Sequence, residues 1–542
     1  MPKLTIDGKE IEVAPGTRVI EAAKTLGIDI PYYCYHPGLS IAGNCRMCLV
    51  EIEKMPKLQI ACHMQCQDGM VVKADTDKVK KTRQHVLEFL LVNHPLDCPV
   101  CDQAGECWLQ DYYMKHGLYD SRVQENKMKK KKAVPIGPTV MLDQERCILC
   151  SRCVRFTDEI SKTSELGIIN RGDHSEVDLF PGKELDNKYS GNVVDICPVG
   201  ALTDKDFRFK KRVWYLESAN SICTGCARGC NIQIQYSTQR LHHAGGERVV
   251  RLKPRYNVDV NQWWICDEGR YHYSHHDLNR ILEVTKRSEK NVQVETWENA
   301  LKDIAVKIQN AEGKIGVLLS PQLSNEDLYT GLKLFRDDLK LKNIFLVSPH
   351  PGGYQDDFLI QADKNPNSKG AEFLGLPYNT PALEKFLGDC RSGKFQGLIV
   401  FGQDLYELFP QAQEILQKLQ WSIFVGSNHN QMSENANYVL PAATHAEEDG
   451  TFTNFQGKIQ RFERAVLPLG ESLADWQILV NLAKVLGFHI HYDEVDEIFE
   501  ELTLKVKEFN GLVFDKLRME GSDIRTFAAP TIPELQRYDN IL

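Results

Sequence analysis

The chain has 542 residues, too many for one hydrophobic core, so several domains are expected. Its 42% hydrophobic and 26% charged residues are typical of a water-soluble protein, and no apolar run reaches the ~18 residues that suggest a membrane span. The formal charge of −9 argues against nucleic acid as the main partner. No apolar signal region opens the sequence, which predicts a protein that stays in the compartment where it is made.

The first 80 residues are predicted to form a small β-rich domain. Leu4–Ile6 and Ile11–Val13 flank an Asp7-Gly8 turn, which is a hairpin signal. Residues 19–26 predict a short helix that a glycine ends. Residues 79–93 predict a longer helix with one apolar face, which cannot continue through the proline two residues later.

A polar, lysine-rich segment at residues 116–138 is predicted to be a linker. It contains the one basic block of the chain, Lys127–Lys132. For this block a solvated linker is favoured over a docking patch.

Beyond about residue 274, short apolar runs alternate with helical stretches, which indicates an α/β domain with a largely parallel sheet. Strands are expected at 315–319, 344–347, 398–401 and 423–425, and helices at 325–339 and 410–419. No glycine-rich nucleotide motif follows these strands, so no nicotinamide, flavin or nucleoside triphosphate site is expected.

The cysteines indicate the chemistry of the chain. There are 17, and all except Cys390 come before residue 267. A secreted disulfide framework usually needs a signal peptide and a short chain, and neither is present. Closely spaced thiols therefore predict metal ligands.

The first set of candidate ligands is Cys34, Cys45, Cys48 and Cys62. A pair separated by two residues, with one ligand upstream and one downstream, follows the pattern of a plant-type [2Fe–2S] loop, although these gaps are longer. Cys66 competes for the fourth position. Cys62 is preferred because it closes a strand-like segment.

The second set is His94, Cys98, Cys101 and Cys107. Three thiolates this close suit the corners of a [4Fe–4S] cubane, and an imidazole is predicted at the fourth corner because no spare cysteine lies nearby. Replacing a thiolate by neutral imidazole makes a cluster one unit less negative, which by itself raises its potential.

The third set is Cys147, Cys150, Cys153 and the distant Cys197, which precedes a proline. In two-cluster bacterial ferredoxins, the fourth cysteine of each run binds the other cluster. Here the position for the second crossing ligand is Thr157. One cluster has thus lost its ligands, and the other keeps all four.

The fourth set is Cys223, Cys226, Cys230 and Cys266, a four-cysteine [4Fe–4S] pattern in which Cys266 is the least constrained member. Structural zinc is the alternative for all four sets. Zinc motifs typically consist of two separated Cys-x2-Cys pairs, whereas triplets with one remote ligand fit a cubane better. Iron–sulfur clusters are therefore favoured.

The four motifs, in this order, resemble those of the G-subunit family of bacterial respiratory NADH–quinone oxidoreductase, or complex I, which includes the mitochondrial 75-kDa subunit. The resemblance implies one [2Fe–2S] and three [4Fe–4S] clusters on the four sets, the fourth being an extra cluster of some bacterial members. Residues 274–542 resemble a molybdopterin oxidoreductase, most clearly at Ala436–Phe462. Because this part is short and lacks a cysteine ligand for molybdenum, no molybdenum cofactor is expected, and Glu447, Asp449 and Thr451 are expected to be fold or surface residues.

These features predict a multidomain chain of α+β and α/β class, with N-terminal ferredoxin-like modules before a truncated molybdopterin-oxidoreductase-like domain. The expected domains are a [2Fe–2S] ferredoxin-type domain at 1–80, a His/Cys-ligated [4Fe–4S] domain at 81–138, a degenerate two-cluster ferredoxin-like domain at 139–216, a [4Fe–4S] domain at 217–273 and the α/β domain at 274–542.

The resemblance implies an electron relay within a peripheral membrane complex, on the cytoplasmic side of a bacterial inner membrane. Its partners would be the NADH/FMN-binding subunit and the subunits near the quinone site. An electron-transfer subunit of a soluble NAD-linked hydrogenase or formate dehydrogenase is the alternative. Arg46, Arg152 and Arg155, beside the ligands, either tune cluster potentials or are ordinary solvated arginines.

Overall fold

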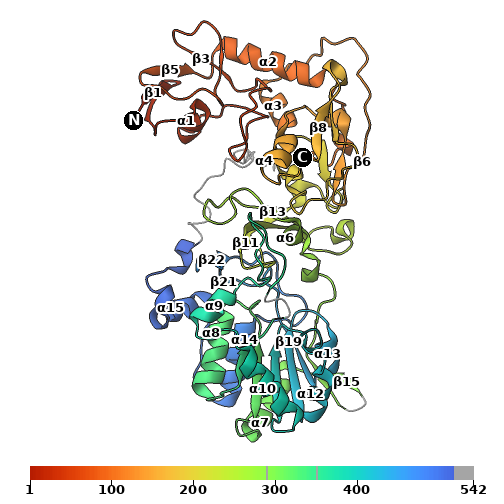
Figure 1. Ribbon diagram of the computed structural model, residues 1–542, viewed down its shortest axis with the longest axis vertical. Helices are drawn as coiled ribbons and strands as arrows, with labels where there is room; N and C mark the ends of the chain where they lie inside the picture. Colours follow the sequence, from red (N-terminus) through yellow and green to blue (C-terminus); the bar gives the residue numbers. More distant parts are fainter. Residues whose placement is uncertain (289–290, 349–351, 518–542) are drawn as a thin grey trace. The chain divides into compact units, whose positions relative to one another are not determined.

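The computed structural model describes residues 1–288, 291–348 and 352–517, which form two compact units (Figure 1). Unit 1 covers Met1–Tyr215, and unit 2 begins at Leu216. The last 25 residues of the domain expected at 274–542 lie outside the described residues, and its finer boundaries stay predictions. Within the described part of the chain, no helix is both long and apolar enough to cross a bilayer.

Unit 1 opens with a five-stranded sheet in the order β2-β1-β5-β3-β4. Its elements are β1 (Lys3–Ile6), β2 (Lys9–Glu12), α1 (Val19–Thr25), β3 (Leu49–Ile52), β4 (Gln59–Ile60) and β5 (Met70–Lys73). The predicted hairpin is confirmed, because β1 and β2 pair antiparallel with Leu4 opposite Ile11. The predicted first helix is α1, and Glu21 caps it by accepting a hydrogen bond from the Arg18 backbone N–H at 2.9 Å.

The second predicted helix is α2 (Asp77–Leu91), which begins two residues earlier than expected. The Thr76 side chain explains this start, because it accepts a hydrogen bond from the Val79 N–H and so satisfies one of the free donors of the first turn. Leu87 is fully buried on the apolar face. Helix α2 leads to a 3-10 turn η1 (Cys98–Val100) and then to α3 (Trp108–His116).

The lysine block is not uniformly solvated. Lys127 Nζ donates to two backbone carbonyls at the C-terminal end of α2, at 2.7 and 2.9 Å, where a helix lacks its own donors. Lys132 forms ion pairs with Asp97 and Glu145, both at 2.8 Å. These contacts fasten the segment to the protein, while the Lys132 side chain stays 42% exposed.

The remainder of unit 1 has two small sheets, β10-β7-β6 and β8-β9. Its elements are β6 (Val134–Pro135), β7 (Val140–Leu142), α4 (Arg152–Glu159), β8 (Leu166–Ile169), β9 (Glu176–Leu179), α5 (Asn192–Asp195) and β10 (Leu202–Asp204), with 3-10 turns η2 (Gln144–Arg146) and η3 (Gly172–His174). One hydrophobic core joins the N-terminal sheet, α1 and α3 to the cysteine-bearing loops of this region.

Unit 2 opens with a three-stranded antiparallel sheet followed by a larger sheet in the order β15-β14-β20-β19-β18-β16-β17. Its strands are β11 (Glu217–Ile222), β12 (Asn231–Tyr236), β13 (Val249–Pro254), β14 (Thr285–Arg287), β15 (Val292–Val294), β16 (Ile315–Leu319), β17 (Ile344–Leu346), β18 (Gly397–Phe401), β19 (Trp421–Gly426), β20 (Tyr438–Pro441), β21 (Gly450–Thr453) and β22 (Ile459–Phe462). Its helices are α6 (Asp267–Tyr271), α7 (Trp297–Asn310), α8 (Asn325–Leu332), α9 (Ser368–Phe373), α10 (Thr380–Arg391), α11 (Leu405–Leu408), α12 (Ala412–Lys418), α13 (Gln431–Asn435), α14 (Asp475–Leu486) and α15 (Val495–Lys505).

The predicted α/β domain is confirmed, since β16 to β20 form a parallel set. Alternating side chains of these strands enter two separate cores. Val317 and Ile399 pack with α7, α8 and α14, whereas Leu318 and Val400 pack with α10, α12 and α13 (Figure 1). Helices on both faces explain why β16 and β18 are apolar at every position.

The fold of unit 2 also depends on a buried carboxylate. Glu447 is 1% exposed and pairs with Arg280 at 2.7 Å and Arg248 at 2.8 Å. Burial alone would raise the pKa of Glu447, but hydrogen bonds and charge from the two arginines hold it below its usual value. Thr451, also fully buried, donates to Glu326 at 2.7 Å. Both residues thus hold loops in place.

We expect Glu447→Ala to lower the free energy of unfolding of unit 2 by about 3–5 kcal/mol, because it leaves the buried guanidinium of Arg280 without its counter-charge and leaves Arg248 with Asp277 alone. Asp449→Ala, two residues further along, is the matched control and should cost less than about 1 kcal/mol. Thermal and urea unfolding of the full chain measure both. An equal loss in the two variants would contradict the bracing role of Glu447.

Candidate metal centres

The first four predicted ligands come together in a loop that packs on the N-terminal sheet. The Cys34 side chain lies within hydrogen-bonding distance of Cys45 and Cys62, and Cys62 also reaches Cys48. Hydrogen bonds from Cys45 and Cys62 lower the pKa of Cys34, so the group favours a thiolate. The Tyr33 backbone N–H points at Cys45 Sγ at 3.5 Å, the kind of donor that stabilises a bound sulfur.

Cys66, the competing ligand, lies apart from this group. Its backbone N–H donates to the Thr17 carbonyl at 2.8 Å, and Glu21 is the charged neighbour of its thiol. Burial, and then Glu21, raise the pKa of Cys66 to about 11, and no cysteine of the set acts on it, whereas Cys62 lies within hydrogen-bonding distance of Cys34 and Cys48. The geometry therefore favours Cys62.

The three cysteines of the second set also lie near one another. Cys98 and Cys101 flank the turn η1, and the charge of Cys101 acts on Cys107, which immediately precedes α3. Arg212 fixes this loop by donating to the backbone carbonyls of Pro99 and Cys101. Cys98 is exposed, whereas Cys101 is buried.

His94 is held as a neutral imidazole beside this loop. Its Nδ1 is buried and has no hydrogen-bond partner. Burial lowers the pKa of His94 to about 4, and nearby cations such as Arg146 add to this, while Asp97 opposes it. A neutral ring with an unpaired nitrogen is the form that binds a metal.

The third set surrounds one small cavity of about 20 Å³, which all four sulfur-bearing residues line. The loop that carries Cys147 and Cys150 turns sharply, because Leu149 and Ser151 both adopt left-handed backbone conformations, with φ of +55° and +60°. The Leu149 N–H in turn points at Cys147 Sγ at 3.4 Å. Thr157, at the position of the lost crossing ligand, is fully buried and donates to a backbone carbonyl of its own helix.

Gly200 permits the second and third sets to pack closely. A Cβ at Gly200 would lie 2.2 Å from Cys101 Sγ, far inside van der Waals contact. The Trp108 N–H also donates a hydrogen bond to the carbonyl of Pro198, the residue after Cys197, at 3.0 Å. Only a residue without a side chain fits between these two sites.

Arg152 joins the loops of the first three sets. Its guanidinium donates to the Tyr35 carbonyl, next to Cys34, at 2.5 Å, and to the Ile196 carbonyl, next to Cys197, at 3.0 Å. The same group stacks over the Trp108 ring at 4.4 Å, beside Cys107. Arg152 is 1% exposed, so the alternative of an ordinary solvated arginine is wrong for it.

The other two arginines noted in the sequence behave differently. Arg155 bridges the first and third sets by donating to the carbonyls of Cys34 at 2.6 Å and Cys150 at 3.4 Å. Arg46 is exposed, and its φ of +58° turns the loop between Cys45 and Cys48.

The fourth set belongs to unit 2. Each of its four thiols is buried, and the charges of Cys223, Cys226 and Cys266 all act on Cys230. Cys266, the least constrained member in the sequence, begins α6 and accepts a hydrogen bond from the Gly269 N–H at 3.3 Å. A Cβ at Gly269 would lie 2.7 Å from Cys223 Sγ, so this glycine lets the two ends of the set approach.

Burial raises the pKa of most of these thiols, for example that of Cys147 to about 12. Neutral thiols form only weak hydrogen bonds, so a buried group of them gains little stabilisation from one another. Metal ligation needs the thiolate form and releases the thiol protons. The donor sets therefore fit iron–sulfur clusters, whose positive iron ions offset the cost of the buried charge.

Sequence reasoning did not identify the contacts of Arg152, because each joins residues more than 40 positions apart. It also missed three histidines of unit 2, His275, His276 and His445, which come together from two distant segments. No spacing rule along the chain signals such a group.

We expect Arg152→Lys to reduce the iron content of unit 1 and to lower the free energy of unfolding by about 2–4 kcal/mol, because lysine cannot bond both carbonyls and stack on Trp108. Arg46→Lys, an exposed neighbour of the first set, is the matched control. Iron analysis and thermal unfolding after anaerobic purification measure both. Full iron and unchanged unfolding in Arg152→Lys would contradict the joining role.

Comparison with family models identifies four regions of the chain. They are a 2Fe-2S iron-sulfur cluster binding domain at 2–77, the NADH-ubiquinone oxidoreductase-G iron-sulfur binding region at 83–122, the ferredoxin-like domain of NADH-quinone oxidoreductase subunit 3 at 137–203 and a molybdopterin oxidoreductase domain at 379–485. The expected fold class, with ferredoxin-like modules before a molybdopterin-oxidoreductase-like domain, is thereby confirmed.

Similar proteins extend over nearly the whole chain. The G subunit of the NADH-quinone oxidoreductase of Rickettsia conorii is 32% identical over 94% of this chain and 91% of its own length. The mitochondrial NADH-ubiquinone oxidoreductase 78 kDa subunit of Neurospora crassa is 30% identical over 92% of this chain and 82% of its own. A chain of a NAD+-reducing [NiFe]-hydrogenase structure aligns with 39% of this chain and 91% of its own, at 31% identity and a TM-score of 0.36. The chain belongs to the G-subunit family of NADH–quinone oxidoreductase, the iron–sulfur electron-transfer subunits of complex I.

Proposed function

We propose that this chain carries electrons through one [2Fe–2S] and three [4Fe–4S] clusters held by four ligand sets. The ligands are Cys34, Cys45, Cys48 and Cys62 for the binuclear cluster, and His94, Cys98, Cys101 and Cys107, then Cys147, Cys150, Cys153 and Cys197, then Cys223, Cys226, Cys230 and Cys266 for the three cubanes. The observation that carries the proposal is the convergence of the first three sets, distant in sequence, around Arg152 in one core.

The contacts between the sets support an order for the relay in unit 1. The third set touches both others, through Arg155 between Cys34 and Cys150 and through Gly200 against Cys101. The first and second sets are separated by an aromatic layer that includes Tyr32 and Trp108, whose ring centroids lie 5.6 Å apart. Electrons would therefore pass from the first set to the third and then to the second, although the chain order differs.

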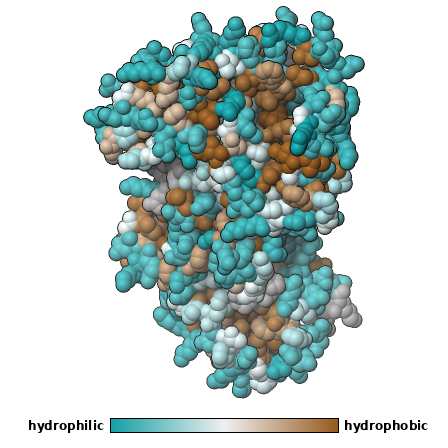
Figure 2. Space-filling model, turned by 45° about the horizontal axis from the view of Figure 1, so that its top comes forward, coloured by the Kyte–Doolittle hydropathy of each residue, from teal (hydrophilic) through white to brown (hydrophobic). Residues whose placement is uncertain are grey.

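Two partners of complex I would complete the route. The NADH/FMN-binding subunit would supply single electrons to the first set, and subunits near the quinone site would accept them from the second. The exposure of Cys98 and of two apolar side chains within two residues of it, Leu96 and Val100, supports a partner contact there. Figure 2 shows such apolar side chains, in brown, among polar ones on the face that it presents.

Two further assignments rest on the family. The chain would sit in the peripheral part of the complex on the cytoplasmic side of the membrane, and contact the membrane only through its partners. The fourth set would lie off the main route, and residues 274–542 would be a scaffold without molybdenum.

The iron content of anaerobic protein tests the cluster assignment. We expect about 14 iron atoms per chain, two from the binuclear cluster and four from each cubane, with matching acid-labile sulfide and no stoichiometric molybdenum. Stepwise reduction should resolve four EPR signals. Iron near 10 would mean that one cubane is absent, and zinc in place of iron would overturn electron transfer.

His94→Cys tests the imidazole ligand. The variant should keep a cubane at the second set but shift its potential to a lower value and change its EPR signal, because a thiolate adds one negative charge. His85→Cys, on α2 and outside the sets, is the matched control and should leave that signal unchanged. A wild-type signal in His94→Cys would exclude His94 as a ligand.

A further inference from the structure

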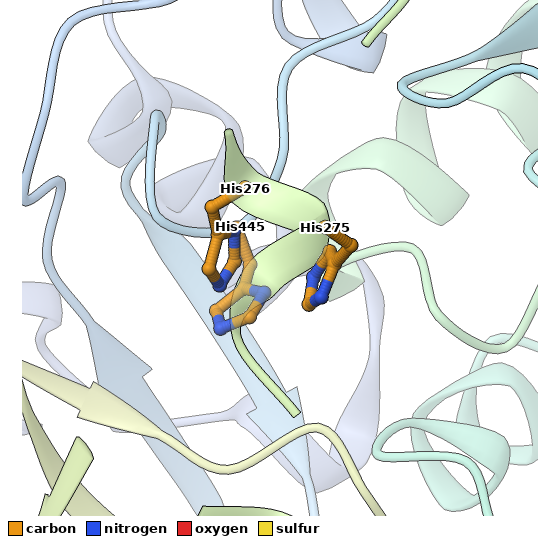
Figure 3. A group of neighbouring side chains, drawn as sticks. All are labelled: His275, His276 and His445. Carbon is orange, nitrogen blue, oxygen red and sulfur yellow. The ribbon is translucent and has the colours of Figure 1, made fainter. Parts of the chain in front are cut away.

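Three histidines of unit 2 point their rings toward one another at a place that no cluster assignment uses. His275 and His276 lie in a 3-10 turn, η6 (Ser274–His276), and His445 lies in the loop after β20 (Figure 3). One ring nitrogen from each lies within 4.8 Å of one from each of the others. The ring centroids of His275 and His276 are 4.0 Å apart, and those of His276 and His445 are 4.7 Å apart.

The ring nitrogens of this group lack partners. Nδ1 of His275 and Nε2 of both His276 and His445 are buried and have no hydrogen bond. Packing of aromatic rings alone leaves these polar atoms unpaired, which is unfavourable because each has lost its hydrogen bonds to water. A bound cation would satisfy all three at once.

The three imidazoles are in the protonation state that metal binding requires. Burial lowers the pKa of each ring below its usual value, to about 4 for His445, and the charges of neighbouring histidines add to this. The rings are therefore neutral at physiological pH, and each offers a lone pair.

A hydrogen-bond chain determines which ring nitrogen of His276 keeps a free lone pair. The Thr444 hydroxyl donates to Glu447 at 3.3 Å and lies 2.9 Å from His276 Nδ1. Since its proton goes to Glu447, the hydroxyl accepts from Nδ1–H, which leaves the lone pair on Nε2. Metal-binding histidines commonly have such an outer partner on the second ring nitrogen.

The backbone that carries the group is braced by the buried ion pairs of Glu447. Arg280 and Arg248 both donate to the His276 carbonyl, at 2.8 and 3.0 Å, while they pair with Glu447. The turn with His275 and His276 and the loop with His445 are thus fixed to one another. Such preorganisation limits the movement needed to close a site.

A cavity of about 630 Å³ gives access to the group. His275 and His445 line it, and His272, whose ring centroid lies 4.7 Å from that of His275, does so too. Its floor is the carboxyl end of the parallel sheet, where Ser320 follows β16 and Gly402 follows β18. The chain reverses its winding direction between these two strands, a usual place for ligands in α/β sheets.

We propose that His275, His276 and His445 form a binding site for a divalent first-row transition ion, with Zn²⁺ as the best match. Imidazole suits ions of this class, and three histidines plus one exchangeable position are a common zinc arrangement. Tetrahedral ligation needs nitrogens about 3.3 Å apart, so small ring rotations close the present spacing. A cavity water or His272 is available as the fourth ligand.

Zinc binding to the cluster-loaded full chain tests the site. We expect one Zn²⁺ per chain after equilibration with zinc and removal of the excess. Zinc-edge X-ray absorption should show imidazole nitrogens at about 2.0–2.1 Å rather than sulfur at about 2.3 Å. A sulfur shell would mean that zinc had entered a cysteine set, and absence of bound zinc in wild type would equally overturn the site.

Substitutions locate the bound ion. His275→Gln and His445→Gln should each weaken zinc binding by about tenfold or more while the iron content stays at its wild-type level. His429→Gln is the matched control, because His429 is exposed and its interaction with Asn279 uses only its backbone. If His275→Gln and His445→Gln both kept the wild-type zinc affinity, the proposal would be contradicted. If a variant fails to fold, the zinc-edge X-ray absorption spectrum of the wild-type protein still tests which atoms bind the ion.

Discussion

The N-terminal half of this protein depends on a single buried guanidinium. Arg152 bonds the backbone next to Cys34 and next to Cys197, and it stacks on the aromatic ring next to Cys107. A guanidinium has five donors in one plane and an apolar face, so it can satisfy carbonyls and pack against a ring at the same time. Loops without regular hydrogen bonding thereby acquire a common anchor.

Burying the thiols of these loops costs free energy, which explains why cluster binding and folding are coupled here. Most thiols of the four sets are buried, and burial opposes their ionisation. Clusters reverse this balance, because thiolate ligands bind iron and the binding free energy becomes part of the folding free energy. Cys66 and Cys390, buried outside the sets, keep raised pKa values and pack as small apolar residues.

Unit 2 also has a buried charged group that holds distant loops together, but this group is a carboxylate and the loops surround a cavity. Glu447 gathers Arg248 and Arg280 in the interior and so fixes the loops around a cavity at the carboxyl end of the parallel sheet. Residues 379–485 of this domain match the molybdopterin oxidoreductase family. The histidine group on the cavity wall shows that polar residues from distant segments of this domain still converge there.

Local patterns were sufficient to predict much of this protein. The hairpin at β1 and β2, the helices α1 and α2 and the parallel strands of unit 2 follow from turn residues and apolar periodicity, which act over a few residues. The cysteine spacings predicted four ligand sets, because most ligands of one cluster share a short loop. The same reasoning did not reveal the contacts of Lys127 and Lys132, whose ammonium groups reach carbonyls and carboxylates elsewhere in the chain.

Tertiary structure decided the remainder. Composition could not show that Arg152 is buried, that Cys62 lies beside Cys34, or that His445 meets His275 across 170 positions of sequence. The physical reason is the same in each case. Sequence by itself determined which groups can bind iron, since that depends on residue type and local spacing, whereas packing of distant segments determined which of those groups meet.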